Sequence, residues 1–186
     1  IDSWLIFKLT GLHATDFTNA SRTMLFDIGT LEWDKQLCGL FGVDPVSLPE
    51  PMPSQHDYGV THASIFGGAE VPVAGIAGDQ QAALFGQACF SPGMTKNTYG
   101  TGSFVLMNVG DTCPEPVDGL LTTIAWEIPR ADGAEATTTT YALEGAIFVT
   151  GAAVQWLRDG LGLIEEAAEI GPLAATVPDT GGVFLV

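Results

Sequence analysis

Two short stretches of this chain, residues 75–86 and 97–102, hold the residue types best suited to catalysis or ligand binding. In the first, an apolar run is followed by Gly78, Asp79 and a helix-forming segment, which places a carboxylate at the C-terminal end of a predicted strand. Open α/β folds bind their ligands at that end of their strands. In the second, Gly100-Thr101-Gly102 follows another predicted strand and can present backbone N–H groups to an anion. A carboxylate base combined with an anion-binding turn is what phosphoryl transfer requires.

Both features also have simpler structural interpretations. Asp79 could be the N-cap of the following helix, because Asp is a preferred capping residue, although Ala82 stands where a capping box would have Glu or Gln. The glycines of Gly100-Thr101-Gly102 could serve only a hairpin turn. Local sequence alone favours the capping interpretation of Asp79.

Composition excludes several classes of partner. The chain has 186 residues, is 46% hydrophobic and carries a formal net charge of -16, with 6 Lys and Arg against 22 Asp and Glu. Such a charge argues against binding to nucleic acid or to anionic membranes. No apolar run reaches the roughly 18 residues of a membrane span. The scattered cysteines (Cys38, Cys89, Cys113) form no metal-binding pattern and favour reduced thiols in a cytoplasmic protein.

Longer ordered runs carry a family resemblance. They are residues 15–26 (TDFTNASRTMLF), 78–87 (GDQQAALFGQ), 96–104 (KNTYGTGSF), 141–145 (YALEG) and 151–159 (GAAVQWLRD). Through these runs the chain resembles the FGGY family of carbohydrate kinases, and among its members those that act on glycerol. The resemblance implies a two-domain α/β fold of the actin/hexokinase-like (ribonuclease H-like) type.

Residues 1–90 are expected to be the C-terminal part of the family's N-terminal, substrate-binding domain. Residues 91–186 are expected to be the N-terminal part of its C-terminal, nucleotide-binding domain. The chain starts at Ile1 without an initiator Met and stops at Val186 within an apolar run, so we expect an internal fragment that is inactive in isolation.

The resemblance also implies roles for individual residues in ATP-dependent phosphorylation of glycerol. Asp79 is expected to be the catalytic base and to contact the substrate together with Gln80 and Phe104. An amide such as that of Gln80 can both donate hydrogen bonds to a diol and accept them. The expected nucleotide-binding residues are Gly100, Thr101, Gly102, Gly151 and Gln155.

Mg²⁺ is expected to accompany ATP, with no metal ligand assigned to this chain. The full-length protein is expected to be a homo-oligomer without nucleic-acid partners or a membrane span. Two alternatives stay open: another FGGY sugar or polyol kinase, such as a pentulose kinase, and a non-catalytic binding protein on the same scaffold.

The coarse pattern predicts the elements around these residues. Helices are expected over 32–41, 79–89 and 144–161, and strands over 60–66, 71–76, 94–99, 103–109, 119–126 and 137–143. Residues 129–136 are expected to be a hairpin loop and residues 183–186 the start of a strand. Arg22 is predicted to form a structural salt bridge, Arg158 and Asp159 an ion pair or cap, and Gln81 to be structural.

Overall fold

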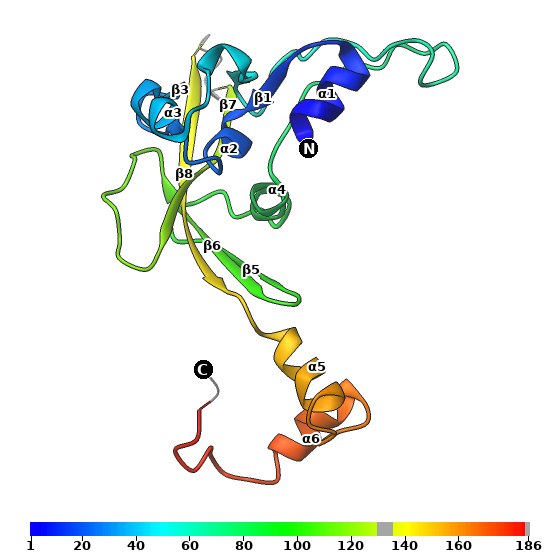
Figure 1. Ribbon diagram of the computed structural model, residues 1–186, viewed down its shortest axis with the longest axis vertical. Coiled ribbons are helices and arrows are strands. Elements are labelled where there is room, and N and C mark those ends of the chain that lie inside the picture. The colour runs from blue at the N-terminus through cyan, green and yellow to red at the C-terminus, as the bar shows by residue number, and fades with distance from the viewer. Residues whose placement is uncertain (130–135, 185–186) are drawn as a thin grey trace. The chain divides into compact units, whose positions relative to one another are not determined.

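The structure is a computed structural model that describes residues 1–129 and 136–184. It divides into two compact units, shown in Figure 1. Unit 1 comprises Ile1–Lys96 and Val105–Gly145, and unit 2 comprises Asn97–Phe104 and Ala146–Val186. The division falls inside three strands, so each unit combines segments that are distant in sequence.

The first part of unit 1 alternates short helices and strands. They are α1 (Asp2–Thr10), β1 (Ala14–Asp16), α2 (Phe17–Ala20), β2 (Phe26–Asp27), β3 (Glu32–Trp33), α3 (Lys35–Phe41), a 3₁₀ turn (Pro45–Ser47) and β4 (Glu50–Met52). Strand β1 pairs in parallel with β4, and β2 pairs antiparallel with β3. The β1–β4 pair therefore ends at Asp16, immediately before α2 begins.

The second part of the chain supplies helix α4 and the main sheet. These elements are α4 (Asp79–Gly86), β5 (Thr95–Tyr99), β6 (Ser103–Gly110), β7 (Leu121–Pro129) and β8 (Thr137–Ile147). The strand order is β5-β6-β8-β7, and β7 pairs antiparallel with β8 with a bulge between Ile124 and Trp126. Figure 1 shows α2 beside the long β7–β8 pair, and both α2 and α4 pack against β7.

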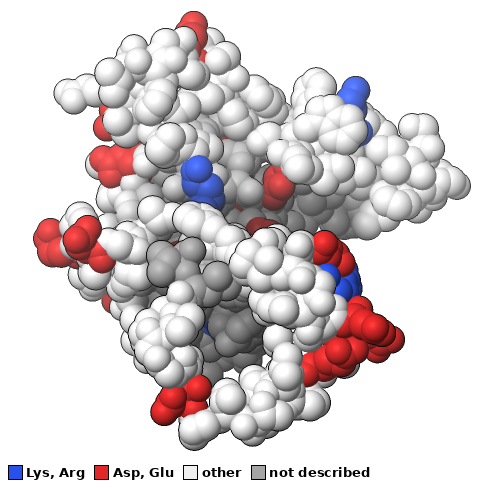
Figure 2. All heavy atoms as spheres, turned by 60° about the horizontal axis from the view of Figure 1, so that its bottom comes forward, with Lys and Arg blue, Asp and Glu red and all other residues white. Residues whose placement is uncertain are grey.

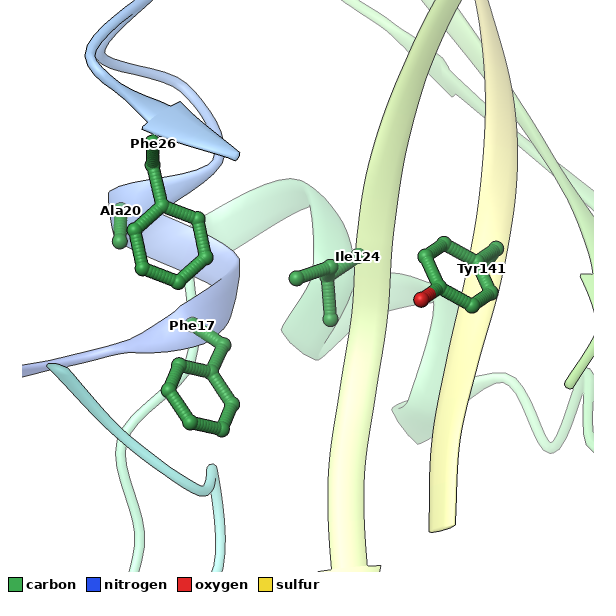
Figure 3. Packing of buried hydrophobic residues seen from close by; sticks show 5 residues of the cluster. All are labelled: Phe17, Ala20, Phe26, Ile124 and Tyr141. Carbon is green, nitrogen blue, oxygen red and sulfur yellow. The ribbon is translucent and has the colours of Figure 1, made fainter. Parts of the chain in front are cut away.

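The core of unit 1 forms where α2 and β2 meet this sheet. Figure 3 shows Phe17, Ala20 and Phe26 facing Ile124 of β7, with Tyr141 on the neighbouring β8. The rings of Phe17 and Phe26 stack with centroids 5.7 Å apart. The Tyr141 hydroxyl donates to the carbonyl of Ile28 at 3.0 Å, and burial raises the pKa of Tyr141. This core fixes α2, and with it the residues at the end of β1, against the sheet.

Unit 2 is built around α5 (Gly151–Asp159), followed by a 3₁₀ turn (Ala167–Glu169) and α6 (Ile170–Ala174). The Arg158 guanidinium pairs with Asp159 at 2.6 Å, which confirms the predicted ion pair at an exposed site. Hydrogen bonding to Asp159 raises the pKa of Arg158, and hydrogen bonding to Arg158 lowers the pKa of Asp159.

The structure departs from the predicted elements mainly in three regions. The helix expected over 32–41 begins only at Lys35, because Asp34 caps it by accepting from the amides of Gln36 and Leu37. Segments 60–66 and 71–76 make only isolated antiparallel bridges, one of them between Val60 and Pro72. Since Pro72 has no N–H, it cannot extend a regular ladder at that point.

The third difference concerns residues 144–150, which are not helical as expected. Strand β8 continues to Ile147, and the helix starts at Gly151. Residues 130–135 of the expected hairpin loop and residues 185–186 of the expected last strand lie outside the described residues. The predicted domain boundary between residues 90 and 91 stays a prediction.

The surface reflects the acidic composition. Figure 2 shows one face on which Asp and Glu side chains gather in several groups, with few Lys and Arg side chains among them. Among the described residues, no helix is long and apolar enough to cross a membrane.

Candidate active site

Asp79 is the first residue of α4, and Gly78 is the N-cap. The capping interpretation of Asp79 is therefore wrong, since its own backbone is already helical. Its Oδ1 accepts from the backbone N–H of Gln80 at 2.8 Å and its Oδ2 from the Gln80 side-chain amide at 3.3 Å. The carboxylate is otherwise exposed, and its place in the first turn is favoured by the helix dipole. A carboxylate held in this way can accept a proton from a bound hydroxyl.

The side chain of Gln80 lies between Asp79 and a buried lysine. The Lys96 ammonium donates to Gln80 Oε1, and Lys96 is only 1% exposed. Burial lowers the pKa of Lys96, while the charges of Glu144 and Asp79 oppose that shift. The carbonyl oxygen of the Gln80 amide is thus engaged by the protein, and its nitrogen faces Asp79.

A hydrogen-bond network fixes the turn that precedes Asp79. Asp16 is fully buried, and its Oδ2 accepts from the Thr18 N–H at 3.1 Å, the Thr18 hydroxyl at 2.7 Å and the Ser54 hydroxyl at 2.9 Å. The Thr18 oxygen in turn accepts from the backbone N–H of Gly78 at 2.8 Å. The end of β1 is thereby connected to the start of α4, one residue before the carboxylate.

Gly78 and Gln81 complete this turn. A Cβ added to Gly78 would lie 2.6 Å from Gln81 Oε1, so no larger residue fits without moving that side chain. Gln81 is buried and donates to the Thr123 hydroxyl at 3.0 Å, which confirms its predicted structural role. Arg22 pairs with the buried Glu144 at 2.8 Å, as predicted for a structural salt bridge.

Asp16→Asn is expected to destabilise the protein by about 1–3 kcal/mol, because the new amide nitrogen would face a backbone N–H in either orientation, that of Thr18 at Oδ2 or that of Asn19 at Oδ1. The measurement is the free energy of unfolding in urea for the full-length protein. The matched control is Asp34→Asn, at a partly exposed cap that accepts two backbone amides of α3. An equal, small loss for both variants would contradict the role given to Asp16.

An apolar cavity of about 560 Å³ also borders α4. Its walls include Ile76, Phe85, Trp126 and Ile128, and no charged side chain lines it. A polyol needs several hydrogen-bonding partners, so the cavity does not suit a substrate such as glycerol.

In unit 2, the turn formed by Gly100, Thr101 and Gly102 packs against the start of α5. The N–H groups of Thr150 and Ala152 donate to the Thr101 carbonyl at 2.9 and 3.1 Å. The N–H of Gly151 donates to the Gly100 carbonyl at 3.0 Å. The first amides of α5 therefore hold the turn in place rather than facing outward.

The turn itself keeps part of its anion-binding capacity. The N–H of Gly100 donates to the Gly102 carbonyl at 2.8 Å. Within the described part of the chain, the N–H groups of Thr101 and Gly102 donate to no protein acceptor. Two successive free amides and the exposed Thr101 hydroxyl can together bind a phosphate oxygen.

Close backbone packing requires two of these glycines. A Cβ on Gly102 would lie 2.6 Å from the Ile147 carbonyl oxygen, and a Cβ on Gly151 would lie 2.5 Å from the Gly100 carbonyl oxygen. Gln155 is exposed on α5, four residues after Gly151, and Phe104 is half-buried at the start of β6.

The predicted site residues thus fall into two groups. Asp79 and Gln80 contact each other in unit 1, and Gly100, Thr101, Gly102 and Gly151 pack together in unit 2, which also holds Phe104 and Gln155. Sequence reasoning did not single out the residues behind them: Asp16, Lys96 and Glu144. Lys96 belongs to the run that carries the resemblance, but nothing in the sequence marks it as buried.

The His, Cys, Asp and Glu side chains of the described residues give little support to a metal site formed by protein ligands alone. Among the described residues there is no group of three or more His, Cys, Asp or Glu that could hold a metal ion. Mg²⁺ in phosphoryl-transfer sites takes one or two carboxylates and otherwise binds water and substrate phosphates.

Comparison with known proteins gives matches over nearly the whole chain. Residues 1–86 match the N-terminal domain, and residues 95–186 the C-terminal domain, of the FGGY family of carbohydrate kinases. Glycerol kinase 2 of Thermotoga maritima is 59% identical and glycerol kinase of Carboxydothermus hydrogenoformans 57% identical to this chain, both over its full length. The chain spans about 36% of the length of these curated relatives.

Solved structures agree with the family match. The crystal structure of Plasmodium falciparum glycerol kinase with ADP superposes with a TM-score of 0.85 at 38% identity, covering 97% of this chain and 35% of that one. Xylulose kinase of Rhodospirillum rubrum gives a TM-score of 0.76 at 23% identity, covering 95% of this chain and 35% of that one, a likeness of fold alone. The predicted α/β fold of the actin/hexokinase-like kinases is confirmed.

Proposed function

Because this chain belongs to the FGGY family of carbohydrate kinases, we propose that the full-length protein transfers the γ-phosphoryl group of ATP to a terminal hydroxyl of glycerol, giving sn-glycerol 3-phosphate. The observation that carries the proposal is the identity of 59% and 57% to two glycerol kinases across the whole of this chain. The geometry of Asp79 and of the Gly100–Gly102 turn supports it.

Asp79 is the proposed base. The glycerol hydroxyl oxygen attacks the γ-phosphorus, the bond from that phosphorus to the ADP oxygen breaks, and the hydroxyl proton passes to the Asp79 carboxylate. The exposed position of this carboxylate leaves it accessible to a substrate. Gln80 donates to a substrate hydroxyl, and Phe104 is proposed to cover the apolar carbon chain of glycerol.

The nucleotide is assigned to the residues of unit 2. The free amides of Thr101 and Gly102 and the Thr101 hydroxyl suit the β- and γ-phosphates. Gly151 leaves room for the turn to approach α5, and Gln155, one turn further along α5, is proposed to contact the nucleotide's ribose. Mg²⁺ bound to the phosphates supplies charge neutralisation, and no ligand from the described residues is assigned to it.

The remaining expectations concern the whole protein. Cys38, Cys89 and Cys113 are all free, which supports a reducing, cytoplasmic location. Assembly as a homo-oligomer stays a prediction, which light scattering of the full-length protein checks.

The test is a coupled ADP-release assay on the full-length protein with glycerol, erythritol and a panel of pentuloses. Turnover with glycerol at a higher kcat/KM than with any pentulose is the expected result. A higher kcat/KM with a pentulose would show that glycerol is not the preferred substrate, while the family assignment would stand. Absence of turnover with every compound would favour a non-catalytic binding protein.

A further inference from the structure

A series of interacting charged and polar side chains in unit 1 leads to Asp79. Arg22 binds the buried Glu144 through Oε1, and the Oε2 atom of Glu144 has no hydrogen-bond partner. The charge of the Glu144 carboxylate opposes the lowering of the pKa that burial causes at the fully buried Lys96. Lys96 donates to Gln80, and Gln80 donates to Asp79. The order is therefore cation, anion, cation, amide and anion, from the exposed Arg22 through the buried Glu144 and Lys96 to the exposed Asp79.

The two neighbours of the Gln80 amide, Lys96 and Asp79, allow it only one orientation. An ammonium group only donates hydrogen bonds, so it must face the amide oxygen. An ionised carboxylate only accepts, so it must face the amide nitrogen. Lys96 and Asp79 stand on the corresponding sides of the amide. A flipped amide would place its oxygen against the carboxylate and its nitrogen against the ammonium.

We propose that Lys96 is a positioning residue that locks the Gln80 amide, so that Gln80 contacts the substrate only as a hydrogen-bond donor. This inference rests on the proposed function and refines the sequence-based expectation that the amide both donates and accepts. One N–H of the Gln80 amide is used by Asp79, and the other is left for a substrate oxygen. A hydroxyl that accepts from this N–H beside Asp79 keeps its own proton free for transfer to the carboxylate.

Burying the Lys96 ammonium group costs free energy, which a purely structural role would not require. An ammonium taken out of water loses its hydration, and a well-packed apolar side chain in the same place is often neutral or stabilising. At 1% exposure, Lys96 loses most of that solvation, which lowers its pKa, while the charges of Glu144 and Asp79 oppose the shift. A role in orienting Gln80 explains why a cation, rather than an apolar side chain, stands there.

The experiment is a double-mutant cycle of Lys96→Met and Gln80→Ala in the full-length kinase, read as KM for glycerol and kcat separately. Lys96→Met is expected to raise KM for glycerol by about 10-fold, the worth of one hydrogen bond, with a smaller change in kcat and none in KM for ATP. In the Gln80→Ala background, Lys96→Met is expected to change KM by about 2-fold or less, because the group that Lys96 orients is gone.

Lys35→Met, at an exposed lysine on α3, is the matched control and is expected to leave every constant unchanged. If thermal melts show that Lys96→Met unfolds the protein, the cycle is run in a Glu144→Gln background, which removes the buried charge left without Lys96. If Lys96→Met changes KM for glycerol equally with and without Gln80, the inference about Lys96 is overturned, but the proposed function stands. A wild-type enzyme inactive on every polyol would overturn the proposed function and this inference together.

Discussion

Asp79→Asn in the full-length protein is expected to lower kcat with glycerol by about 10²–10⁴-fold, the usual contribution of a positioned base. The amide keeps the shape of the side chain and an oxygen for the Gln80 N–H, but it cannot take up the hydroxyl proton. Asp79 is exposed, and its carboxylate accepts only from two groups of Gln80 among the described residues, so the fold is expected to be unaffected. The measurement is ADP release under saturating ATP and glycerol, with a thermal melt of each variant.

Asp57→Asn is the control for this variant. Asp57 is also exposed and also accepts a nearby backbone amide, that of Gly59 at 2.9 Å. Its replacement is expected to leave kcat unchanged. Near-normal turnover of Asp79→Asn, or an equal loss in Asp57→Asn, would show that Asp79 is not the base.

The local structure around Asp79 and around the glycine turn could be predicted because short sequence signals mark both places, whereas the roles proposed for these residues rest on the resemblance. A glycine and an acid between an apolar run and a helix predicted the position of Asp79, and the Gly100-Thr101-Gly102 run predicted the turn after β5. Arg22 was predicted to form a salt bridge because basic residues are few in so acidic a chain. For Asp79 and for the turn, the decisive feature is local in the sequence.

The supporting network could not be predicted, because its partners are far apart in the chain. Asp16 and Ser54 are separated by 38 residues and Arg22 and Glu144 by 122. A buried lysine has the same sequence signature as an exposed one, so Lys96 passed unnoticed. The helix expected to start at Glu144 begins only at Gly151. The residues of this region fit a helix and a strand equally well, and Glu144 instead pairs with Leu121 of β7.

The turn in unit 2 gives the second large prediction. Gly102→Ala is expected to lower kcat/KM for ATP by about 10²-fold, the cost of moving a positioning group by about 1 Å. The new Cβ would lie 2.6 Å from the Ile147 carbonyl oxygen and 2.9 Å from that of Phe148, so backbone must move. The displaced groups would include the Thr101 and Gly102 amides assigned to the phosphates. Gly151→Ala, whose Cβ meets the Gly100 carbonyl oxygen at 2.5 Å, is expected to act in the same direction.

Gly171→Ala separates loss of nucleotide binding from a general effect of replacing glycine. Gly171 lies near the start of α6 in the same unit, and a Cβ there meets nothing within 4 Å. Its replacement is expected to leave ADP affinity, measured by calorimetry, unchanged. Gly102→Ala and Gly151→Ala are expected to weaken ADP binding while leaving the fluorescence-detected melting of the protein in the absence of nucleotide cooperative. If both variants bind ADP like the wild type, the phosphates are held elsewhere, and the turn has only the hairpin role that its sequence also allows.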